Sequence, residues 1–230
     1  MKVYTPQPPA FLTGPMSVLL TNSQSYSARA EWHSDTAIPG EKPVTGQLLA
    51  RGSKLFFASD VADPSDKHSQ SGGFAFIWDV ASHSGYVLSD PLQGDAPVSW
   101  QLHPTNFVAQ PGPGAPQNFA GHPCQPTTAT VQMSDSSSAS FQVLRAADLG
   151  GVPLRIGANS SPMALSLSKV RLEALSADLF MPPDGFTMYG SPEALADELA
   201  ARQHNFRRKN YEGSAPMLEY PGSGTGPKPY

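Results

Sequence analysis

Histidine and cysteine are the residue types best suited to bind metal ions or to act as nucleophiles, and the chain contains few of them. The cysteine is Cys124, and the histidines are His33, His68, His83, His103, His122 and His204. No two histidines have a metal-ligand spacing, and no His-Glu-x-x-His sequence occurs. A lone cysteine allows no internal disulfide and no cysteine-based zinc site. His122-Pro-Cys124 is the one suggestive pair, and a loop entering a strand explains it equally well. We therefore predict no metal site, no cofactor and no thiol catalysis.

Serine and aspartate offer two other routes to catalysis. Serine is abundant, but the chain lacks a Gly-x-Ser-x-Gly elbow, a phosphate loop and a dinucleotide fingerprint. Six aspartates cluster over residues 60–95, at Asp60, Asp63, Asp66, Asp79, Asp90 and Asp95. Two carboxyl groups about 5–10 Å apart can hydrolyse a glycosidic bond, so a hydrolase using these loop carboxylates is one alternative. Aspartates beside Pro64 and Pro91 are also common turn formers, and we predict that the protein is not an enzyme.

The composition favours strands joined by many turns. Charged residues make up 15% of the 230 residues, whereas the usual share is roughly 25%. The 24 prolines and 20 glycines also disfavour a helical bundle. A net charge of −4, with no lysine or arginine over 68–144, excludes a nucleic-acid surface. Apolar runs are shorter than the about 20 residues that a membrane-spanning helix needs, so membrane contact is peripheral at most.

Alternation of apolar and polar residues identifies the strands. Residues 18–32 are predicted to form one long strand, or two with a bend near Asn22–Gln24, that buries one face, either the even-numbered positions with Tyr26 and Trp32 or the opposite face. The last strand, 163–175, changes its buried face midway, which predicts a β-bulge at Ser168-Lys169. Further strands and hairpins are expected at 46–60, 74–89, 128–133, 139–145 and 153–156.

Prolines mark the segments expected to lie outside the strands. We predict an extended arm over 1–15, a long loop over 90–126, which holds eight prolines, and a flexible Pro/Gly tail over 211–230. Ser191-Pro192 opens a C-terminal helix over 192–209, acidic at its start and basic at its end. The fold class is mainly β, with one domain over 16–210 that contains at least eight or nine antiparallel strands, arranged as a curved sheet that wraps a helix or as a barrel.

Aromatic side chains fall on the expected strands at Tyr26, Trp32, Phe57, Phe76 and Trp78. A curved sheet of long strands can enclose more space than its own side chains fill. An apolar hollow of that kind binds a greasy ligand through burial worth about 25 cal/mol per Å². We predict that these five residues line such a cavity. The alternative is that they form an ordinary filled core, in a structural or protein-interaction module.

The segment 179–189, LFMPPDGFTMY, resembles the closing strand of the bacterial lipoprotein-carrier superfamily, the LolA/LppX-like half-barrels. The segment 141–155, FQVLRAADLGGVPLR, resembles a strand, a short break and a returning strand of the same superfamily. Gly121-His-Pro-Cys124 is similar to a feature of related envelope proteins of unknown function. The resemblance covers residues 17–189.

This resemblance implies a curved, open antiparallel half-barrel sheet, here of about 8–11 strands, with an apolar concave side that helices partly close. It also implies non-catalytic binding of lipoprotein acyl chains or other lipids in the bacterial envelope. We therefore expect a monomeric periplasmic or cell-envelope protein whose signal peptide has been removed. Its expected partner is a lipid, an acyl chain or a lipoprotein that it carries, and not a nucleic acid.

Overall fold

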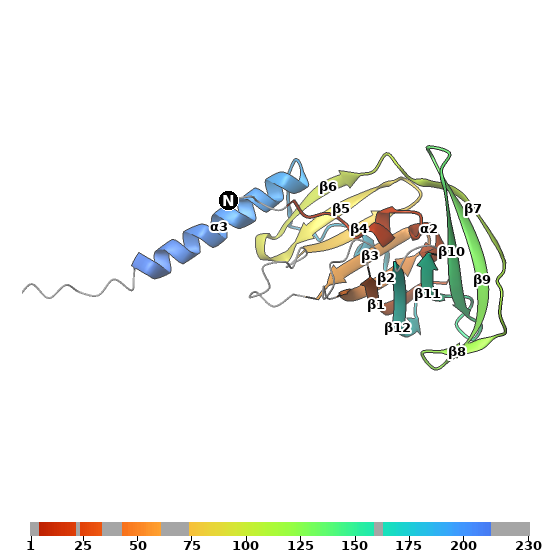
Figure 1. The fold of residues 1–230 in the computed structure, drawn as a ribbon. Coiled ribbons are helices and arrows are strands. Elements are labelled where there is room, and N and C mark those ends of the chain that lie inside the picture. The colour runs from red at the N-terminus through yellow and green to blue at the C-terminus, as the bar shows by residue number, and fades with distance from the viewer. Residues whose placement is uncertain (1–4, 22–23, 34–42, 61–73, 159–162, 213–230) are drawn as a thin grey trace, which may run out of the picture.

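The computed structural model describes residues 5–21, 24–33, 43–60, 74–158 and 163–212, with the backbone alone for 203–212. The protein is mainly β, as predicted, and is built on one open, curved 13-stranded sheet (Figure 1). Its strands are β1 (Tyr26–His33), β2 (Val44–Arg51), β3 (Lys54–Ser59), β4 (Phe74–Asp79), β5 (Ser84–Ser89), β6 (Gly94–Ser99), β7 (Pro104–Pro111), β8 (Gln117–Phe119), β9 (His122–Met133), β10 (Ser138–Ala146), β11 (Pro153–Ala158), β12 (Ala164–Leu172) and β13 (Thr187–Met188). The α-helices are α1 (Ala10–Thr13), α2 (Ser17–Thr21) and α3 (Pro192–Glu212), and the 3₁₀ turns are η1 (Asp90–Leu92) and η2 (Ala177–Phe180).

The strand order is β13-β6-β5-β4-β3-β2-β1-β12-β11-β10-β9-β7, and β8 also pairs with β9. The pairing of β1 with β12 joins two antiparallel halves, β2 to β6 on one side and β7 to β11 on the other. The short strand β13 pairs in parallel with β6. The sheet is therefore open, with β7 at one border and β6 with β13 at the other.

The alternation in β1 places Tyr26, Ala28, Ala30 and Trp32 in the core, as predicted. The predicted β-bulge in β12 is confirmed. Ser27 pairs with Arg171 and Arg29 pairs with Ser168, so two residues of β12 lie opposite Ala28 alone. One of them, Lys169, has a φ of +52°, in the left-handed region.

The N-terminal region differs from the prediction. Residues 17–21, expected to begin a strand, form the helix α2, and the expected arm 1–15 contains the helix α1. Adjacent apolar residues are buried together in each helix, Phe11 with Leu12 and Leu19 with Leu20. Two neighbouring side chains of one strand would point to opposite faces of a sheet, so a helix suits these pairs better.

The expected loop over 90–126 is wrong, because that region supplies β6, β7, β8 and the start of β9. Trp100 N donates to His83 O at 3.1 Å, so the backbone groups of Trp100 point toward β5. Backbone groups alternate in direction along a strand, so the nitrogen of Pro97, three residues earlier, points away from β5. Gly112 N donates to Pro126 O at 2.9 Å, which likewise turns the nitrogen of Pro111 away from β9. At both prolines, the missing N–H would have pointed to the open side of a border strand. The sheet therefore loses no hydrogen bond at these positions.

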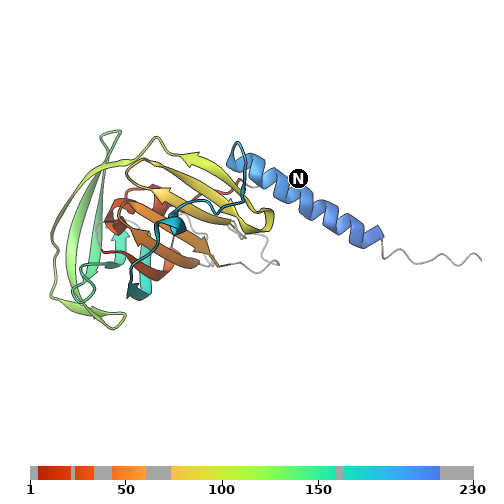
Figure 2. The ribbon, with the colours of Figure 1, turned by 180° about the vertical axis from the view of Figure 1, so that it is seen from behind.

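The C-terminal helix is confirmed as α3, which begins as predicted and extends to Glu212. The Ser191 hydroxyl accepts a hydrogen bond from Ala194 N at 3.3 Å and caps the helix start. Its first turns pack on β6 beside Gly94, where an added Cβ would lie 2.6 Å from the Tyr189 ring. The rest of α3 extends away from the sheet (Figures 1 and 2), and the expected tail beyond residue 212 lies outside the described residues.

The two faces of the sheet have separate cores. The concave face carries the larger one, which includes the two N-terminal helices. On the convex face of β2 to β5, Leu49, Ile77 and Leu88 pack against Phe180 of η2. Residues 179–189, the segment that resembles the closing strand of lipoprotein carriers, thus cross this face (Figure 2). They add only the two-residue β13 to the sheet. Among the described residues, no helix combines the length and apolar character needed to cross a membrane.

Candidate functional site

The five residues predicted to line a cavity lie together in the concave core. Tyr26, Trp32, Phe57, Phe76 and Trp78 are each at most 4% exposed. Phe57 pairs directly with Phe76 across β3 and β4. Burial raises the pKa of Tyr26 far above its usual value, against a smaller opposite effect of Arg145. The phenol therefore stays protonated, and it donates a hydrogen bond to Leu20 O at 3.2 Å.

Residues 10–21, which we call the N-terminal plug, cover these side chains. The Phe11 ring lies 5.1 Å from the Phe57 ring in an edge-to-face arrangement and 5.6 Å from the Trp32 ring, measured between centroids. Phe11, Leu12, Met16, Leu19 and Leu20 of the plug are at most 2% exposed. Around the predicted aromatic residues, the concave face is thus filled by the protein's own N-terminal side chains.

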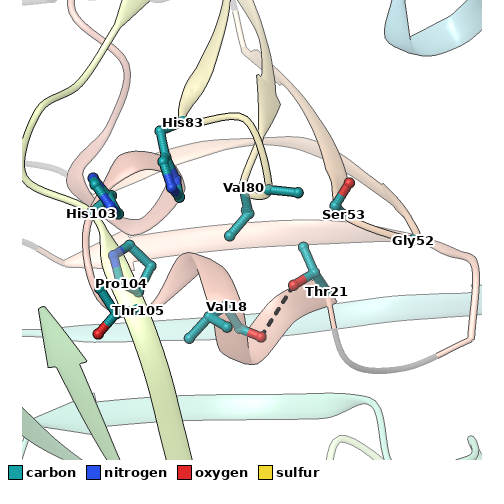
Figure 3. A pocket seen from close by; sticks show the side chains of 10 residues that line it. Val18, Thr21, Gly52, Ser53, Val80, His83, His103, Pro104 and Thr105 are labelled. Carbon is teal, nitrogen blue, oxygen red and sulfur yellow. Dashed lines mark hydrogen bonds between the residues drawn. The ribbon is translucent and has the colours of Figure 1, made fainter. Parts of the chain in front are cut away.

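An open pocket of about 590 Å³, broadly exposed to solvent and called the cavity below, lies at the end of the plug (Figure 3). It is formed where α2, the β2–β3 turn, the β4–β5 turn and the start of β7 meet. The lining residues are Val18, Thr21, Gly52, Ser53, Val80, Ala81, His83, His103, Pro104 and Thr105. None of the five predicted residues is among them. Its volume is within the range of about 300–1,000 Å³ found for small-molecule sites.

His83 and His103, which no sequence motif pairs, form one wall of this cavity. The rings of His83 and His103 are stacked, with centroids 3.6 Å apart and planes 16° from parallel. His83 has a φ of +55°, and its carbonyl accepts a hydrogen bond from Trp100 N at 3.1 Å. In Figure 3 the two rings lie next to each other, on the side opposite Ser53 and Thr21.

The hydrogen bonds of His103 define which ring nitrogen can accept a hydrogen bond. His103 Nδ1 lies 2.8 Å from Gln101 O, and a carbonyl oxygen can only accept, so Nδ1 carries the hydrogen. In the neutral ring, Nε2 then has a lone pair. The backbone is held on both sides, because His103 N donates to Ser134 Oγ at 3.3 Å and Ser134 N donates to His103 O at 2.9 Å.

The remaining lining combines apolar side chains with hydroxyl groups. Val18, Val80 and Pro104 offer apolar surface, while the hydroxyl oxygens of Thr21 and Thr105 keep lone pairs. Their hydrogens are used within the protein, in bonds to Val18 O at 3.2 Å and to Gln132 O at 3.3 Å. No lysine or arginine lines the cavity. Such a lining suits an uncharged molecule with one apolar part and one part that donates hydrogen bonds.

A metal ion does not fit the stacked histidines. Each imidazole directs its lone pair within its own ring plane, so two nearly parallel rings do not aim at one common point. Among the residues that the structure describes, no group of three or more histidine, cysteine or acidic side chains is placed to hold a metal ion.

The pair His122 and Cys124, singled out in the sequence, is not arranged for thiol chemistry. His122 Nδ1 lies 2.8 Å from Asp148 Oδ2, whereas the fully buried Cys124 donates to the backbone oxygen of His122 at 3.4 Å. Burial is the main cause that raises the pKa of Cys124, and Asp148 raises it further, against a smaller effect of a backbone hydrogen bond from Phe119. The sulfur is therefore a protonated, inaccessible thiol.

We expect Cys124 to resist alkylation by iodoacetamide at neutral pH in the folded protein and to react rapidly after unfolding in guanidinium chloride. The physical reason is that the thiolate is the nucleophile and that the side chain has no solvent access. Mass spectrometry of the time course measures the difference. Equal rates in the folded and unfolded protein would show that β9 does not bury this side chain.

Two of the aspartates considered for hydrolysis, Asp60 and Asp79, are far apart and already engaged. Asp60 and Asp79 lie at opposite ends of the β3–β4 ladder. Burial acts to raise the pKa of Asp60, but hydrogen bonds from Thr45 and Arg29 and the charge of Arg29 lower it below its usual value. Asp79 accepts a hydrogen bond from Ala81 N at 3.0 Å, a turn-forming role. Asp63, Asp66 and His68 lie outside the described residues.

Comparisons with known proteins show no family. No protein-family model matches the chain, and no curated protein matches its sequence. Two crystal structures of PNGF-II, in space groups C2 and P21, are each 12% identical and give TM-scores of 0.37 and 0.36. They cover 78% and 80% of this chain but 33% and 34% of their own, so the chain spans about a third of their length.

Proposed function

We propose that this protein is a non-catalytic binding protein that takes an amphipathic, lipid-like ligand into the cavity at the end of the N-terminal plug. The observation that carries the proposal is the cavity of about 590 Å³ with valine and proline side chains on one part and a paired histidine wall on another. The cell-envelope location and the carrier role implied by the resemblance to lipoprotein carriers belong to the same proposal.

The lining also favours a neutral head group over an anionic one. His103 Nε2 and the hydroxyl oxygens of Thr21 and Thr105 accept hydrogen bonds, and no lysine or arginine is present to pair with a carboxylate or phosphate. The chain has a net charge of −4, which adds to the disadvantage of an anion. An acylglycerol, with an apolar chain and hydroxyl donors, matches these groups better than a fatty acid does.

Isothermal titration with monodecanoylglycerol and with decanoate tests this proposal. We expect the acylglycerol to bind more tightly than the acid. Replacing exposed Ala81 at the cavity wall with tryptophan should weaken acylglycerol binding at least about tenfold, or about 1.4 kcal/mol, because the indole occupies the ligand's place. Ala147→Trp, at an exposed turn away from the cavity lining, is the matched control and should bind like the wild type.

A second candidate is a structural or protein-interaction module with a filled core. The packing of Phe11 against Trp32 and Phe57 favours it, because those aromatic residues then serve stability alone. The same titrations separate the two candidates. If neither amphiphile binds, or if Ala81→Trp binds as well as the wild type, the ligand proposal is contradicted and the interaction module is the better reading.

A further inference from the structure

Strand β7 forms one border of the sheet. It pairs with β9 on one side, and among the described residues no strand pairs with its other side. In both views β7, in yellow-green, follows the outer border of the molecule, on the side opposite α3 (Figures 1 and 2). Val108 at its centre is 55% exposed. A border strand of this length offers free backbone groups to another strand.

The hydrogen bonds of the ladder show which groups are offered. Gly112 N donates to Pro126 O at 2.9 Å, and the register continues with Gln110 opposite Thr128 and Val108 opposite Thr130. In an antiparallel pair, successive residues turn their N–H and C=O groups alternately toward and away from the partner strand. The backbone groups of Phe107 and Ala109 therefore point away from β9, toward the open side.

The border lacks the charges that usually prevent two such strands from pairing. Proteins commonly protect exposed strands with lysine, inward-pointing charges, bulges or proline. Residues 96–134 contain no aspartate, glutamate, lysine or arginine. Two copies of this border therefore approach without repulsion between like charges, although the whole chain carries a net charge of −4. The prolines of β7 lie at its ends, Pro104 and Pro111, and the register shifts at Thr105, which leaves the regular stretch 106–110 open.

We propose that β7 pairs with β7 of a second copy of this chain, antiparallel and about a twofold axis that passes beside Val108. In this register each Phe107 lies opposite Ala109 of the second copy, and each such pair exchanges two backbone hydrogen bonds. A large side chain then meets a small one on the concave side. On the convex side, Val108 meets Val108 of the second copy, and Asn106 lies opposite Gln110, whose amides can hydrogen-bond to each other.

The strand sequence is thus self-complementary about its centre, which favours a second copy over an unrelated peptide. The contact is short, so the dimer is weak and its population depends on protein concentration. This proposal is independent of the ligand site, and it replaces the monomer expected from the sequence with a monomer–dimer equilibrium.

Sedimentation velocity from about 1 µM to about 1 mM, a range that spans weak association, tests the dimer. We expect the wild type to shift from monomer to dimer over this range. Val108→Lys and Val108→Glu should each raise the dissociation constant at least about tenfold, because they place like charges directly opposite each other. Mixing the two variants should restore the dimer, because each lysine then meets a glutamate.

Ser140→Lys is the matched control, because Ser140 is exposed on β10, two strands in from the border on the same face. It should dimerise like the wild type. A wild type that stays monomeric throughout overturns the proposal. So does a Ser140→Lys variant that loses the dimer as fully as Val108→Lys, or a mixture of the lysine and glutamate variants that stays monomeric.

Discussion

Replacing Phe11 with alanine is expected to lower the free energy of unfolding by about 3–5 kcal/mol, the range for truncating a fully buried phenylalanine. Phe11 is 0% exposed, and its ring contacts Trp32 and Phe57 on the concave face. Removing the ring leaves a hole that the two sheet aromatics cannot fill by small movements, because Trp32 is fixed in β1 and Phe57 in β3, with β2 between them. Guanidinium unfolding followed by tryptophan fluorescence measures the change.

Phe56→Ala is the matched control for this experiment. Phe56 neighbours Phe57 in β3 but lies half-buried on the convex face, so its truncation should cost less than that of Phe11. An unchanged stability of Phe11→Ala would contradict the packing of the N-terminal plug. It would instead mean that the concave face is available to a ligand in solution.

Gly85→Ala is the second substitution with a large expected effect. Gly85 lies in β5 opposite Trp78, and an added Cβ would come within 1.9 Å of Ile77 O and 3.0 Å of Trp78 Cα. Both neighbours are backbone atoms of β4, so the strand itself must move. Overpacking of this kind costs about 1–3 kcal/mol, and we expect a loss near the upper limit because no side chain can rotate away.

Gly190→Ala provides the matched control, since an added Cβ at Gly190 meets nothing within 4 Å. Its effect on the free energy of unfolding should stay within about 0.5 kcal/mol. Thermal and denaturant unfolding of the two variants give the comparison. If both variants unfold like the wild type, β4 and β5 do not approach as closely at Gly85 as the structure shows.

Local patterns in the sequence predicted the parts of the fold that depend on local rules. In β1, alternation placed Tyr26 and Trp32 on the buried face, because successive strand residues point to opposite sides. A change of that alternation revealed the bulge at Lys169. The start of α3 was visible because Ser191 and Pro192 have side chains suited to a helix start.

The errors in the fold arose where tertiary context decides. Prolines over 90–126 indicated a loop, but Pro97 and Pro111 direct their nitrogens to the open sides of border strands, where no hydrogen bond is lost. The sequence does not state which strand will be at a border. The helices α1 and α2 contain only four and five residues, too few to show helical periodicity, and they are stabilised by packing on the sheet.

The sequence indicated which aromatic residues share the concave face, but neither the place nor the lining residues of the cavity. Alternation brought the five aromatic residues to one face, yet it could not show that Phe11, distant in sequence from Phe57 and Phe76, would cover them. The stacking of His83 on His103 depends on two turns that the curvature of the sheet brings together. No spacing rule relates His83 to His103 in the sequence, so only the structure reveals the cavity.

A crystal structure of the protein soaked with monodecanoylglycerol would show whether the cavity binds an acylglycerol. We expect electron density for one acyl chain against Val18 and Val80, with a glycerol hydroxyl within hydrogen-bond distance of His103 Nε2. Two results would contradict this binding site. One is density for the ligand at another surface. The other is a cavity that holds only water at a ligand concentration that should saturate both the wild type and the Ala147→Trp control.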